Sequence, residues 1–327
     1  MSDESLKIIS LASRNPDRQA ELREGVVRVC ANREFELIFC DSEQDAIAQI
    51  PDTEILLSHG FSPELFRAAR KLRWIQRTDA GIEHTLFPEL VASDVILTNA
   101  RGFHAVPMAE WTLGMLLYIS QSFESIPEWK ADRQWRPVKQ QLTASRFMLR
   151  DKRALVVGYG EIGRPVADLL GAAGLRCEAV ATAARAAAIP VHAVQDLTHI
   201  IGAFDIVVIT MPYTSRTAGL FDHELLTKMK KGAILVNLAR GKIIKQADLI
   251  DALQNGPLGY AALDVFETEP LPEDSPLFDI PNLVMTPHIS GNFPDYIKRM
   301  HELFLDNLER YLKGEPLKFV VDKQRGY

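Results

Sequence analysis

A glycine-rich turn between an apolar run and an amphipathic run constrains the fold of this chain more than any other segment. The sequence is ALVVGYGEIGRPVADLLGAAG, at residues 154–174. Its first glycine permits a tight turn, its second lets the backbone approach a ligand, and its third allows a helix to pack closely on a strand. The exposed N–H groups at the start of that helix attract an anion. The segment therefore predicts a site for the pyrophosphate of a dinucleotide, formed by Gly158, Tyr159, Gly160, Glu161, Ile162 and Gly163. The alternative is a glycine-rich turn in an α/β domain that binds no cofactor.

The end of the next apolar run, EAVATAAR, bears on the choice of dinucleotide. An acidic residue at this place usually holds the adenosine ribose hydroxyls. Ala181 stands there, no carboxylate is nearby, and Arg185 follows. Because an arginine can meet a 2′-phosphate, the pattern favours NADP over NAD. The alternative is that Arg185 is solvated and both cofactors are accepted.

Apolar runs alternate with polar, helix-like runs on both sides of the glycine turn. This β–α alternation, in residues 1–100 and again from 151 onward, predicts two doubly wound parallel sheets, an α/β fold of two Rossmann-like domains. Between the two lies a long apolar segment, 105–126, which predicts a largely buried helix. The polar segment that follows, 127–151, is interpreted as an irregular connector or an interface arm.

Composition excludes several classes of protein. The 327 residues carry a net charge of −6, which gives no general attraction to nucleic acid or to an anionic membrane. No run of about 18 apolar residues occurs, and the acidic start lacks the features of a signal peptide. Cys30, Cys40 and Cys177 show no metal-binding spacing, so we expect no metal site and a reduced, cytoplasmic setting.

Two long segments, 205–244 (DIVVITMPYTSRTAGLFDHELLTKMKKGAILVNLARGKII) and 259–291 (GYAALDVFETEPLPEDSPLFDIPNLVMTPHISG), resemble the D-isomer-specific 2-hydroxyacid dehydrogenases. The resemblance extends more weakly to RWIQRTDAGIE and NARGFHAVPMAEW. It implies an NAD(P)-dependent oxidoreductase that reduces a small 2-keto acid to a D-2-hydroxy acid, with an active-site cleft between domains. It also implies a discontinuous substrate domain, residues 1–100 plus 292–327, and a dinucleotide-binding domain, residues 101–291.

The family's catalytic residues fall on Arg240 in NLARG, Glu269 in DVFETEP and His288 in TPHISG. Hydride addition leaves negative charge on the carbonyl oxygen, so a proton donor is needed, and histidine changes protonation state near neutral pH. Glu269 would orient the ring and favour its charged form. Arg240 would bind the substrate carboxylate and the developing oxyanion through its planar charged fork. Taken singly, each residue has a structural alternative: a salt bridge, a loop charge or a turn cap.

The resemblance also implies further contacts. Asp264 would accept a hydrogen bond from the nicotinamide carboxamide, and Ala80 and Gly81 would bind the substrate carboxylate through backbone amides, although Asp79 is an unexpected neighbour for an anion. The remaining cofactor contacts would be Met211, Pro212, Thr217, Leu238 and Ala239.

Some residues lie outside these motifs. His59, His84 and His104 are interpreted as structural. Members of the family are usually homodimers, which the apolar helix and the polar arm favour. Trp135 in that arm either closes the pocket of a partner subunit or, as we prefer, is buried in the dimer interface.

Two other functions compete with the dehydrogenase. Corepressor-like regulatory proteins share the fold and keep the catalytic residues. Phosphite-type dehydrogenases are also relatives, whereas the formate enzymes pair their histidine with glutamine and this chain has Glu269. The sequence leaves the particular 2-keto acid and the physiological direction open.

Overall fold

Runs of buried Ile, Leu and Val place two parallel sheets in the chain. The computed structural model describes residues 5–82, 85–133 and 135–324. They divide into unit 1, Met1–Phe103 with Phe293–Tyr327, and unit 2, His104–Asn292. The expectation for His84 lies outside the described residues.

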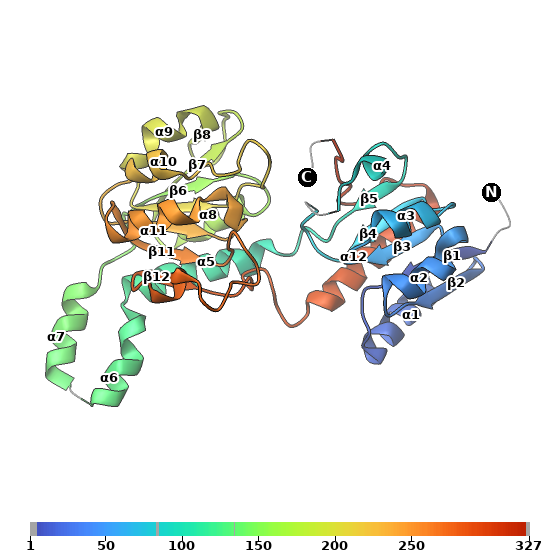
Figure 1. Ribbon diagram of the computed structural model, residues 1–327, viewed down its shortest axis with the longest axis horizontal. Coiled ribbons are helices and arrows are strands. Elements are labelled where there is room, and N and C mark those ends of the chain that lie inside the picture. The colour runs from blue at the N-terminus through green and yellow to red at the C-terminus, as the bar shows by residue number, and fades with distance from the viewer. Residues whose placement is uncertain (1–4, 83–84, 134, 325–327) are drawn as a thin grey trace. The chain divides into compact units, whose positions relative to one another are not determined.

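Unit 1 contains a five-stranded parallel sheet with the strand order β2-β1-β3-β4-β5 (Figure 1). The strands β1, β3 and β4 are almost entirely buried, as expected for a parallel sheet covered on both faces. The strands are β1 (Leu6–Ser10), β2 (Phe35–Phe39), β3 (Ile55–Ser58), β4 (Trp74–Arg77) and β5 (Ile96–Thr98). The helices are α1 (Pro16–Val29), α2 (Glu43–Gln49), α3 (Pro63–Ala68), α4 (Pro88–Val91) and α12 (Tyr296–Lys313).

The chain returns to unit 1 in α12, which packs against α1 and against the sheet core through Met300 and Phe304. The Phe304 ring stacks on the buried Trp74 of β4 with ring centroids 5.4 Å apart. The helix ends at Gly314, whose left-handed backbone (φ 69°) suits a residue without a side chain. Residues from both ends of the sequence therefore share one core.

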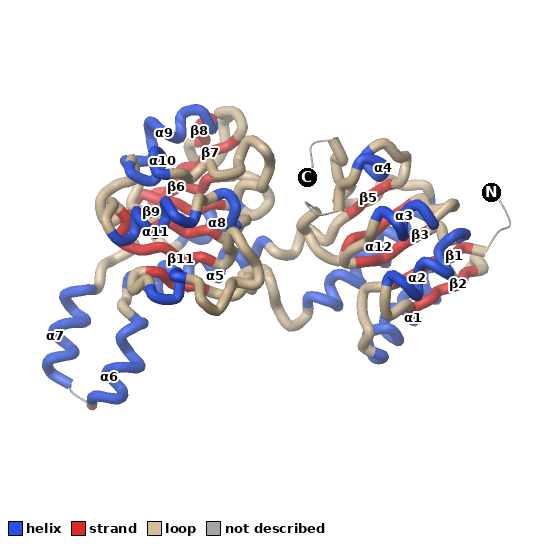
Figure 2. Tube along the Cα trace, in the orientation of Figure 1, coloured by secondary structure: helices blue, strands red, loops and turns tan. Residues whose placement is uncertain are grey.

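Unit 2 contains a seven-stranded parallel sheet with the strand order β12-β11-β10-β9-β6-β7-β8. Helices lie on both of its faces (Figure 2). The strands are β6 (Arg153–Val157), β7 (Arg176–Ala181), β8 (Val191–Ala193), β9 (Ile206–Ile209), β10 (Ala233–Asn237), β11 (Leu258–Leu263) and β12 (Leu283–Met285). The helices are α5 (Ala105–Ser120), α6 (Ile126–Asp132), α7 (Trp135–Ser145), α8 (Gly163–Ala172), α9 (Leu197–Ile200), α10 (His223–Thr227) and α11 (Gln246–Gln254).

The polar arm at 127–151 differs from the expectation of an irregular connector. It forms α6 and α7, which extend away from the sheet of unit 2 (Figure 1). Helix α7 buries none of its described residues, so local helix-forming residues such as those in KQQL determine its structure rather than packing. No helix among the described residues is long and apolar enough to span a membrane.

Candidate functional site

Three neighbouring strands of unit 2 bring the predicted catalytic residues to one edge of the sheet. Arg240 follows β10, Glu269 follows β11 and His288 follows β12, and these strands are adjacent in the order β12-β11-β10. Since both pairings among these strands are parallel, the carboxyl ends of the strands meet at the same edge. Residues separated by as many as 48 positions thus share one edge of the sheet.

His288 and Glu269 form a hydrogen-bonded pair. Nδ1 of His288 lies 2.6 Å from Oε2 of Glu269. The other carboxylate oxygen, Oε1, accepts a hydrogen bond from the backbone N–H of Phe266 at 2.9 Å. Both carboxylate oxygens are therefore fixed, and Nε2 is the ring nitrogen that this pair leaves for chemistry. The His288 side chain is 52% exposed, so the ring is accessible.

Asp264 holds the backbone that carries His288. Its carboxylate accepts hydrogen bonds from Thr286 Oγ1 at 2.5 Å and from the N–H groups of Ile289 and Ser290, both at 2.8 Å. The Asp264 carbonyl accepts from the His288 N–H at 2.9 Å. These bonds stabilise the left-handed backbone of His288 (φ 53°), which is costly for a residue with a side chain.

Trp111 extends this network into α5. Its indole Nε1 donates to Thr286 Oγ1 at 3.1 Å, so the threonine hydroxyl connects the helix to the Asp264 carboxylate. Asp264 has no exposed surface, and its carboxylate is engaged by the His288 loop. The sequence predicted a bond to the nicotinamide carboxamide at this residue, and that role stays a prediction.

A close approach of two backbones fixes Arg240 beside the loop that carries Glu269. A Cβ atom on Gly241 would lie only 1.9 Å from the carbonyl carbon of Phe266. Glycine is therefore required here, and it lets the turn after β10 pack directly on the turn after β11. The Asn237 side chain also donates to the Arg240 carbonyl at 3.0 Å, and Arg240 Nη1 donates to the Ala239 carbonyl at 2.7 Å.

His104, which the sequence assigned a structural role, lies in the same region. Burial, together with the positive charge of Arg240, lowers its pKa to about 4. Its Cδ2 atom lies 3.0 Å from the position that a Cβ on Gly291 would take. The imidazole is thus a neutral ring near both Arg240 and the His288 loop. The sequence feature that could have indicated this position is the segment NARGFHAVPMAEW, which contains His104 and takes part in the family resemblance.

The glycine turn has the shape that a pyrophosphate requires. Gly158 has φ 113°, and a Cβ there would lie 2.5 Å from the Met211 nitrogen. A Cβ on Gly163 would lie 1.8 Å from the Gly158 carbonyl oxygen, whereas a Cβ on Gly160 would have no atom within 4 Å. The turn is therefore closed where helix and strand pack and open where a ligand would approach. Ile162 at the start of α8 provides no side-chain cap, as expected where an anion takes that place.

Arg185 lies against this turn. Its Nη2 donates to the Tyr159 carbonyl at 2.7 Å, and its guanidinium carbon lies 5.9 Å from the centre of the Tyr159 ring. Ala181 occupies the end of β7. At the end of β7 a small apolar side chain thus takes the place of the carboxylate that would hold the ribose hydroxyls, and the exposed Arg185 follows it in the sequence.

The other predicted cofactor residues lie at neighbouring strand ends. Met211 and Pro212 follow β9, and the Thr217 hydroxyl donates to the Pro212 carbonyl at 2.8 Å, closing this loop on itself. Leu238 and Ala239 follow β10 and are buried. Glu161 is exposed on the glycine turn.

Ala80 and Gly81 lie in unit 1, beyond the carboxyl end of β4. The Asn99 side chain donates to the Ala80 carbonyl at 2.7 Å and holds the loop. The unexpected carboxylate of Asp79 is paired with the buried Arg77 through two hydrogen bonds, at 2.9 and 2.7 Å. This pairing offsets the negative charge next to the loop, while burial raises the pKa of Asp79 and the guanidinium opposes that rise.

Trp135, the cysteines and the expected absence of a metal site lie outside the network around His288. Trp135 is 69% exposed and packs edge-on against Trp129 at 5.9 Å between ring centroids. Across residues 5–82, 85–133 and 135–324, no group of three His, Cys, Asp or Glu side chains is placed to hold a metal ion. Cys30, Cys40 and Cys177 are free and buried.

Comparisons with known proteins agree with the motifs. A model of the NAD-binding domain of D-isomer specific 2-hydroxyacid dehydrogenases matches residues 113–290. The chain is 32% identical over 293 residues to a glyoxylate reductase of Thermofilum pendens, covering 86% of this chain and 85% of the relative. It is 30% identical over 275 residues to a formate dehydrogenase of Arabidopsis thaliana, covering 81% and 71%.

A solved structure of a protein from the same family is also similar to this chain. A D-isomer specific 2-hydroxyacid dehydrogenase family protein of Aeromonas salmonicida superposes with a TM-score of 0.81 at 30% identity. The superposition covers 98% of this chain and 100% of that one.

Proposed function

This chain belongs to the D-isomer specific 2-hydroxyacid dehydrogenase family and is an NAD(P)-dependent oxidoreductase, and we propose that His288, Glu269 and Arg240 form its catalytic site. The reaction is the reduction of a small 2-keto acid to a D-2-hydroxy acid. The observation that carries this proposal is the His288–Glu269 pair, held at 2.6 Å at the edge where Arg240 also lies.

His288 supplies the proton. Because Nδ1 faces Glu269, Nε2 donates its proton to the carbonyl oxygen as negative charge develops there. The Glu269 carboxylate stabilises the imidazolium before transfer and keeps the ring oriented. In the reverse direction, Nε2 accepts the proton of the substrate hydroxyl.

Arg240 binds the charged part of the substrate. Its guanidinium remains charged throughout the working pH range and matches the planar geometry of a carboxylate. We assign unit 1 as the substrate domain, in which the backbone amides of Ala80 and Gly81 bind a substrate carboxylate. The Arg77–Asp79 pair supports this assignment because it prevents Asp79 from presenting an unpaired negative charge to the anion.

The glycine turn would hold the cofactor through its pyrophosphate. When bound, a reduced nicotinamide supplies the hydride for the carbonyl carbon. We propose that NADPH is preferred, because Arg185 stands beside the turn and no acidic residue ends β7. Met211, Pro212, Thr217, Leu238, Ala239 and Asp264 complete the proposed cofactor contacts.

A panel of 2-keto acids, assayed with NADH and NADPH separately, tests the proposal. We expect turnover of glyoxylate, hydroxypyruvate or phenylpyruvate, a D-configured product on chiral chromatography, and a higher kcat/KM with NADPH. Binding of cofactor without turnover of any of these acids would contradict the catalytic assignment, and a preference for NADH would contradict the assignment of Arg185.

We also propose a homodimer that buries the arm formed by α6 and α7. The exposed Trp135 and the absence of buried described residues in α7 support it. Sedimentation velocity at micromolar concentration should show a dimer, which Trp135→Ser weakens; a monomer at all concentrations would contradict the proposal.

A further inference from the structure

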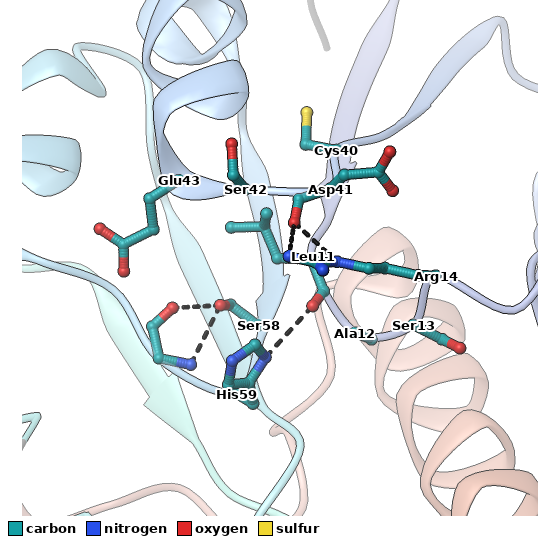
Figure 3. A pocket seen from close by; sticks show the side chains of 11 residues that line it. Leu11, Ala12, Ser13, Arg14, Cys40, Asp41, Ser42, Glu43, Ser58 and His59 are labelled. Atoms are coloured by element: carbon teal, nitrogen blue, oxygen red, sulfur yellow. Dashed lines mark hydrogen bonds between the residues drawn. The ribbon is translucent and has the colours of Figure 1, made fainter.

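Unit 1 has a pocket where the strand order of its sheet reverses. The chain runs from β1 to β2 on one side, and then crosses to β3, β4 and β5 on the other. The pocket lies at the carboxyl ends of β1, β2 and β3 and has a volume of about 480 Å³ (Figure 3). Both its size and its position at a reversal of strand order are typical of small-molecule sites in open α/β sheets.

The lining of this pocket is polar and carries charges of both signs. Arg14 provides a positive charge, and Asp41 and Glu43 provide negative ones. The remaining polar lining comes from Ser13, Ser42, Ser58 and His59. An apolar ligand would remove these groups from water without replacing their hydrogen bonds, which is unfavourable.

Arg14 and Glu43 are held in place by hydrogen bonds but retain hydrogen-bonding capacity. Arg14 donates through Nε and Nη2 to the Asp41 carbonyl, at 2.9 and 2.5 Å, which leaves Nη1 as a donor (Figure 3). Glu43 accepts from the Ser62 N–H through Oε2 at 3.1 Å, which leaves Oε1 as an acceptor. The Asp41 carboxylate forms no hydrogen bond with another described residue and is a further acceptor.

His59 adds an acceptor whose position is fixed by the backbone. Its Nδ1 lies 3.2 Å from the Leu11 carbonyl oxygen (Figure 3). Since a carbonyl can only accept, Nδ1 carries the hydrogen, and Nε2 of the neutral ring presents a lone pair. The pocket therefore contains a donor and several acceptors, an arrangement that suits hydroxyl groups because a hydroxyl both donates and accepts.

The pocket borders the loop assigned to the substrate carboxylate. Strands β3 and β4 are adjacent and parallel, with Ser58 opposite Arg77, so the loops that follow them are neighbours. Arg77 Nη1 lies 4.0 Å from the position that a Cβ on Gly60 would take. His59 is also close enough to Asp79, directly before Ala80, for its protonated form to act on that carboxylate. A carboxylate on the amides of Ala80 and Gly81 is thus next to the pocket.

We propose that this pocket is the subsite for a hydroxylated side chain, and that the substrate is a polyhydroxy 2-keto acid of the sugar-acid class. Arg14, Asp41, Glu43 and His59 bind its hydroxyl groups. The inference rests on the proposed function, because it takes the carboxylate to be bound at Ala80 and Gly81. It goes further by naming the chemistry of the rest of the substrate.

Steady-state kinetics of the full-length protein with three substrates tests this subsite. 2-Keto-D-gluconate and 2-ketohexanoate have six carbons each and differ in their hydroxyl groups, and glyoxylate, which has no side chain, is the reference. We expect kcat/KM for 2-keto-D-gluconate to exceed that for 2-ketohexanoate at least about tenfold, since each net hydrogen bond contributes several-fold. Arg14→Leu and His59→Ala should each lower this ratio about tenfold.

Two controls separate the subsite from general damage. Arg28→Leu changes an exposed arginine of α1, and Glu64→Gln changes an exposed glutamate of α3, and neither residue lines the pocket. Both should keep the ratio within about twofold, while Glu43→Gln lowers it. Circular dichroism melting establishes whether each variant is folded. If Arg14→Leu does not fold, His59→Ala tests the subsite in its place.

The outcomes also distinguish the two proposals. Glyoxylate turnover with no preference for 2-keto-D-gluconate, or an unchanged ratio in folded pocket variants, overturns the subsite alone. Failure of the wild-type protein to reduce any of these three acids, hydroxypyruvate or phenylpyruvate overturns the proposed function, and the subsite with it.

Discussion

Unit 1 and unit 2 each lead a strand into a helix at the point where the strand order reverses, but the two turns present different chemistry. In unit 2, β6 enters the glycine turn, and α8 begins without a side-chain cap. In unit 1, β1 leads to Arg14 and Asn15, and the Asn15 side chain accepts hydrogen bonds from the N–H groups of Asp17 and Arg18 at 2.9 and 3.2 Å. The first N–H groups of α1 are therefore bonded to a side chain, whereas no side chain caps the start of α8.

This difference shows how one topology supports two kinds of site. A turn of glycines exposes backbone N–H groups, which suit a phosphate and do not depend on side chains. A turn with side chains closes the helix terminus through Asn15 and presents Ser13 and Arg14 to a pocket instead. We therefore assign the cofactor to unit 2 and the variable part of the substrate to unit 1.

The largest effect is expected from the chemistry of unit 2. His288→Ala removes the proton donor and should lower kcat at least about a hundredfold, the usual size of general-acid effects. NADPH binding, followed by fluorescence titration, should persist because the glycine turn is untouched. His199→Ala, at an exposed position of α9, is the control. Near-normal turnover by His288→Ala would refute the role of His288 as proton donor, and with it the placement of the reaction in unit 2.

The glycine turn provides a matched pair of substitutions. Gly163→Ala places a methyl group 1.8 Å from the Gly158 carbonyl and should lower the free energy of unfolding by about 2 kcal/mol, as overpacking does. Gly160→Ala enters open space and should keep stability in urea while weakening NADPH binding. Equal stability of both variants would contradict the description of the turn, and unchanged NADPH binding by Gly160→Ala would contradict its role.

A buried histidine in unit 1 predicts acid sensitivity. Burial lowers the pKa of His301 to about 4, and neither ring nitrogen has a hydrogen-bond partner among the described residues. Its unfolded pKa is about 6.5, so between pH 6.5 and 4 the unfolded chain binds a proton that the folded chain does not. Stability is therefore retained above pH 6.5 and falls as the pH decreases toward 4.

His301→Leu should abolish this part of the pH dependence. The free energy of unfolding of the variant minus that of wild type should rise by on the order of 2 kcal/mol when the pH is lowered from 7 to 4.5, as measured by urea unfolding at both pH values. His199→Leu, an exposed histidine of unit 2, should not change the dependence. If the free energy of unfolding depended on pH in the same way in wild type and in His301→Leu, the assignment of this acid sensitivity to His301 in unit 1 would be refuted.

The smallest effect concerns the support of the His288 loop. Thr286→Val removes the bonds from Trp111 and to Asp264, and should cost about 1 kcal/mol of stability and lower kcat several-fold. Thr286→Ser keeps the hydroxyl and should restore kcat, which a purely steric role for the threonine would not explain. An unchanged kcat in Thr286→Val would show that the loop is fixed without this network.

Residue patterns predicted much of the fold and of the site. The glycine turn was recognisable because its backbone requirements are local, and Arg240, Glu269 and His288 because they stand in distinctive motifs. The helices of the arm and strand β8, three residues long, were missed, since neither has a strong pattern of buried residues. The positions of His104 and the network at Asp264 depend on contacts between distant segments, which periodicity does not report.

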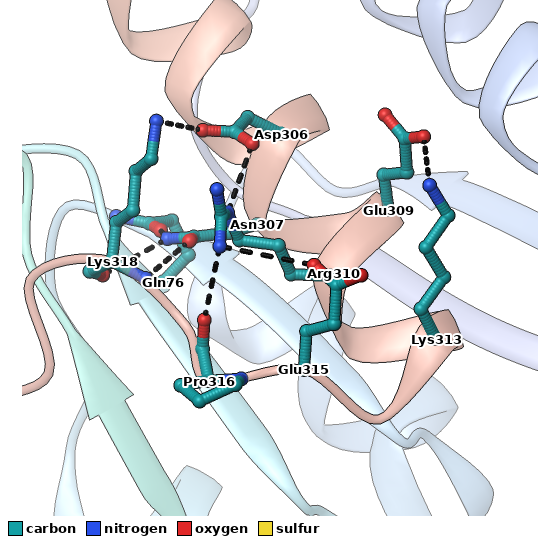
Figure 4. Close-up of polar contacts among 9 residues, drawn as sticks. All are labelled: Gln76, Asp306, Asn307, Glu309, Arg310, Lys313, Glu315, Pro316 and Lys318. Carbon is teal, nitrogen blue, oxygen red and sulfur yellow. Dashed lines mark hydrogen bonds and ion pairs between the residues drawn. The ribbon is translucent and has the colours of Figure 1, made fainter.

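The sequence by itself determined where strands lead into turns and which reactive side chains stand at strand ends, because these properties depend on neighbouring residues. Tertiary structure decided which of those side chains meet. His288 meets Glu269 only because β11 and β12 pair, and Asn307 of α12 donates to Gln76 of β4 at 3.1 Å across 231 positions and accepts from the Lys318 N–H at 2.7 Å (Figure 4). Such contacts form when buried polar groups find partners in a common core, a condition that the whole fold satisfies and no single segment specifies.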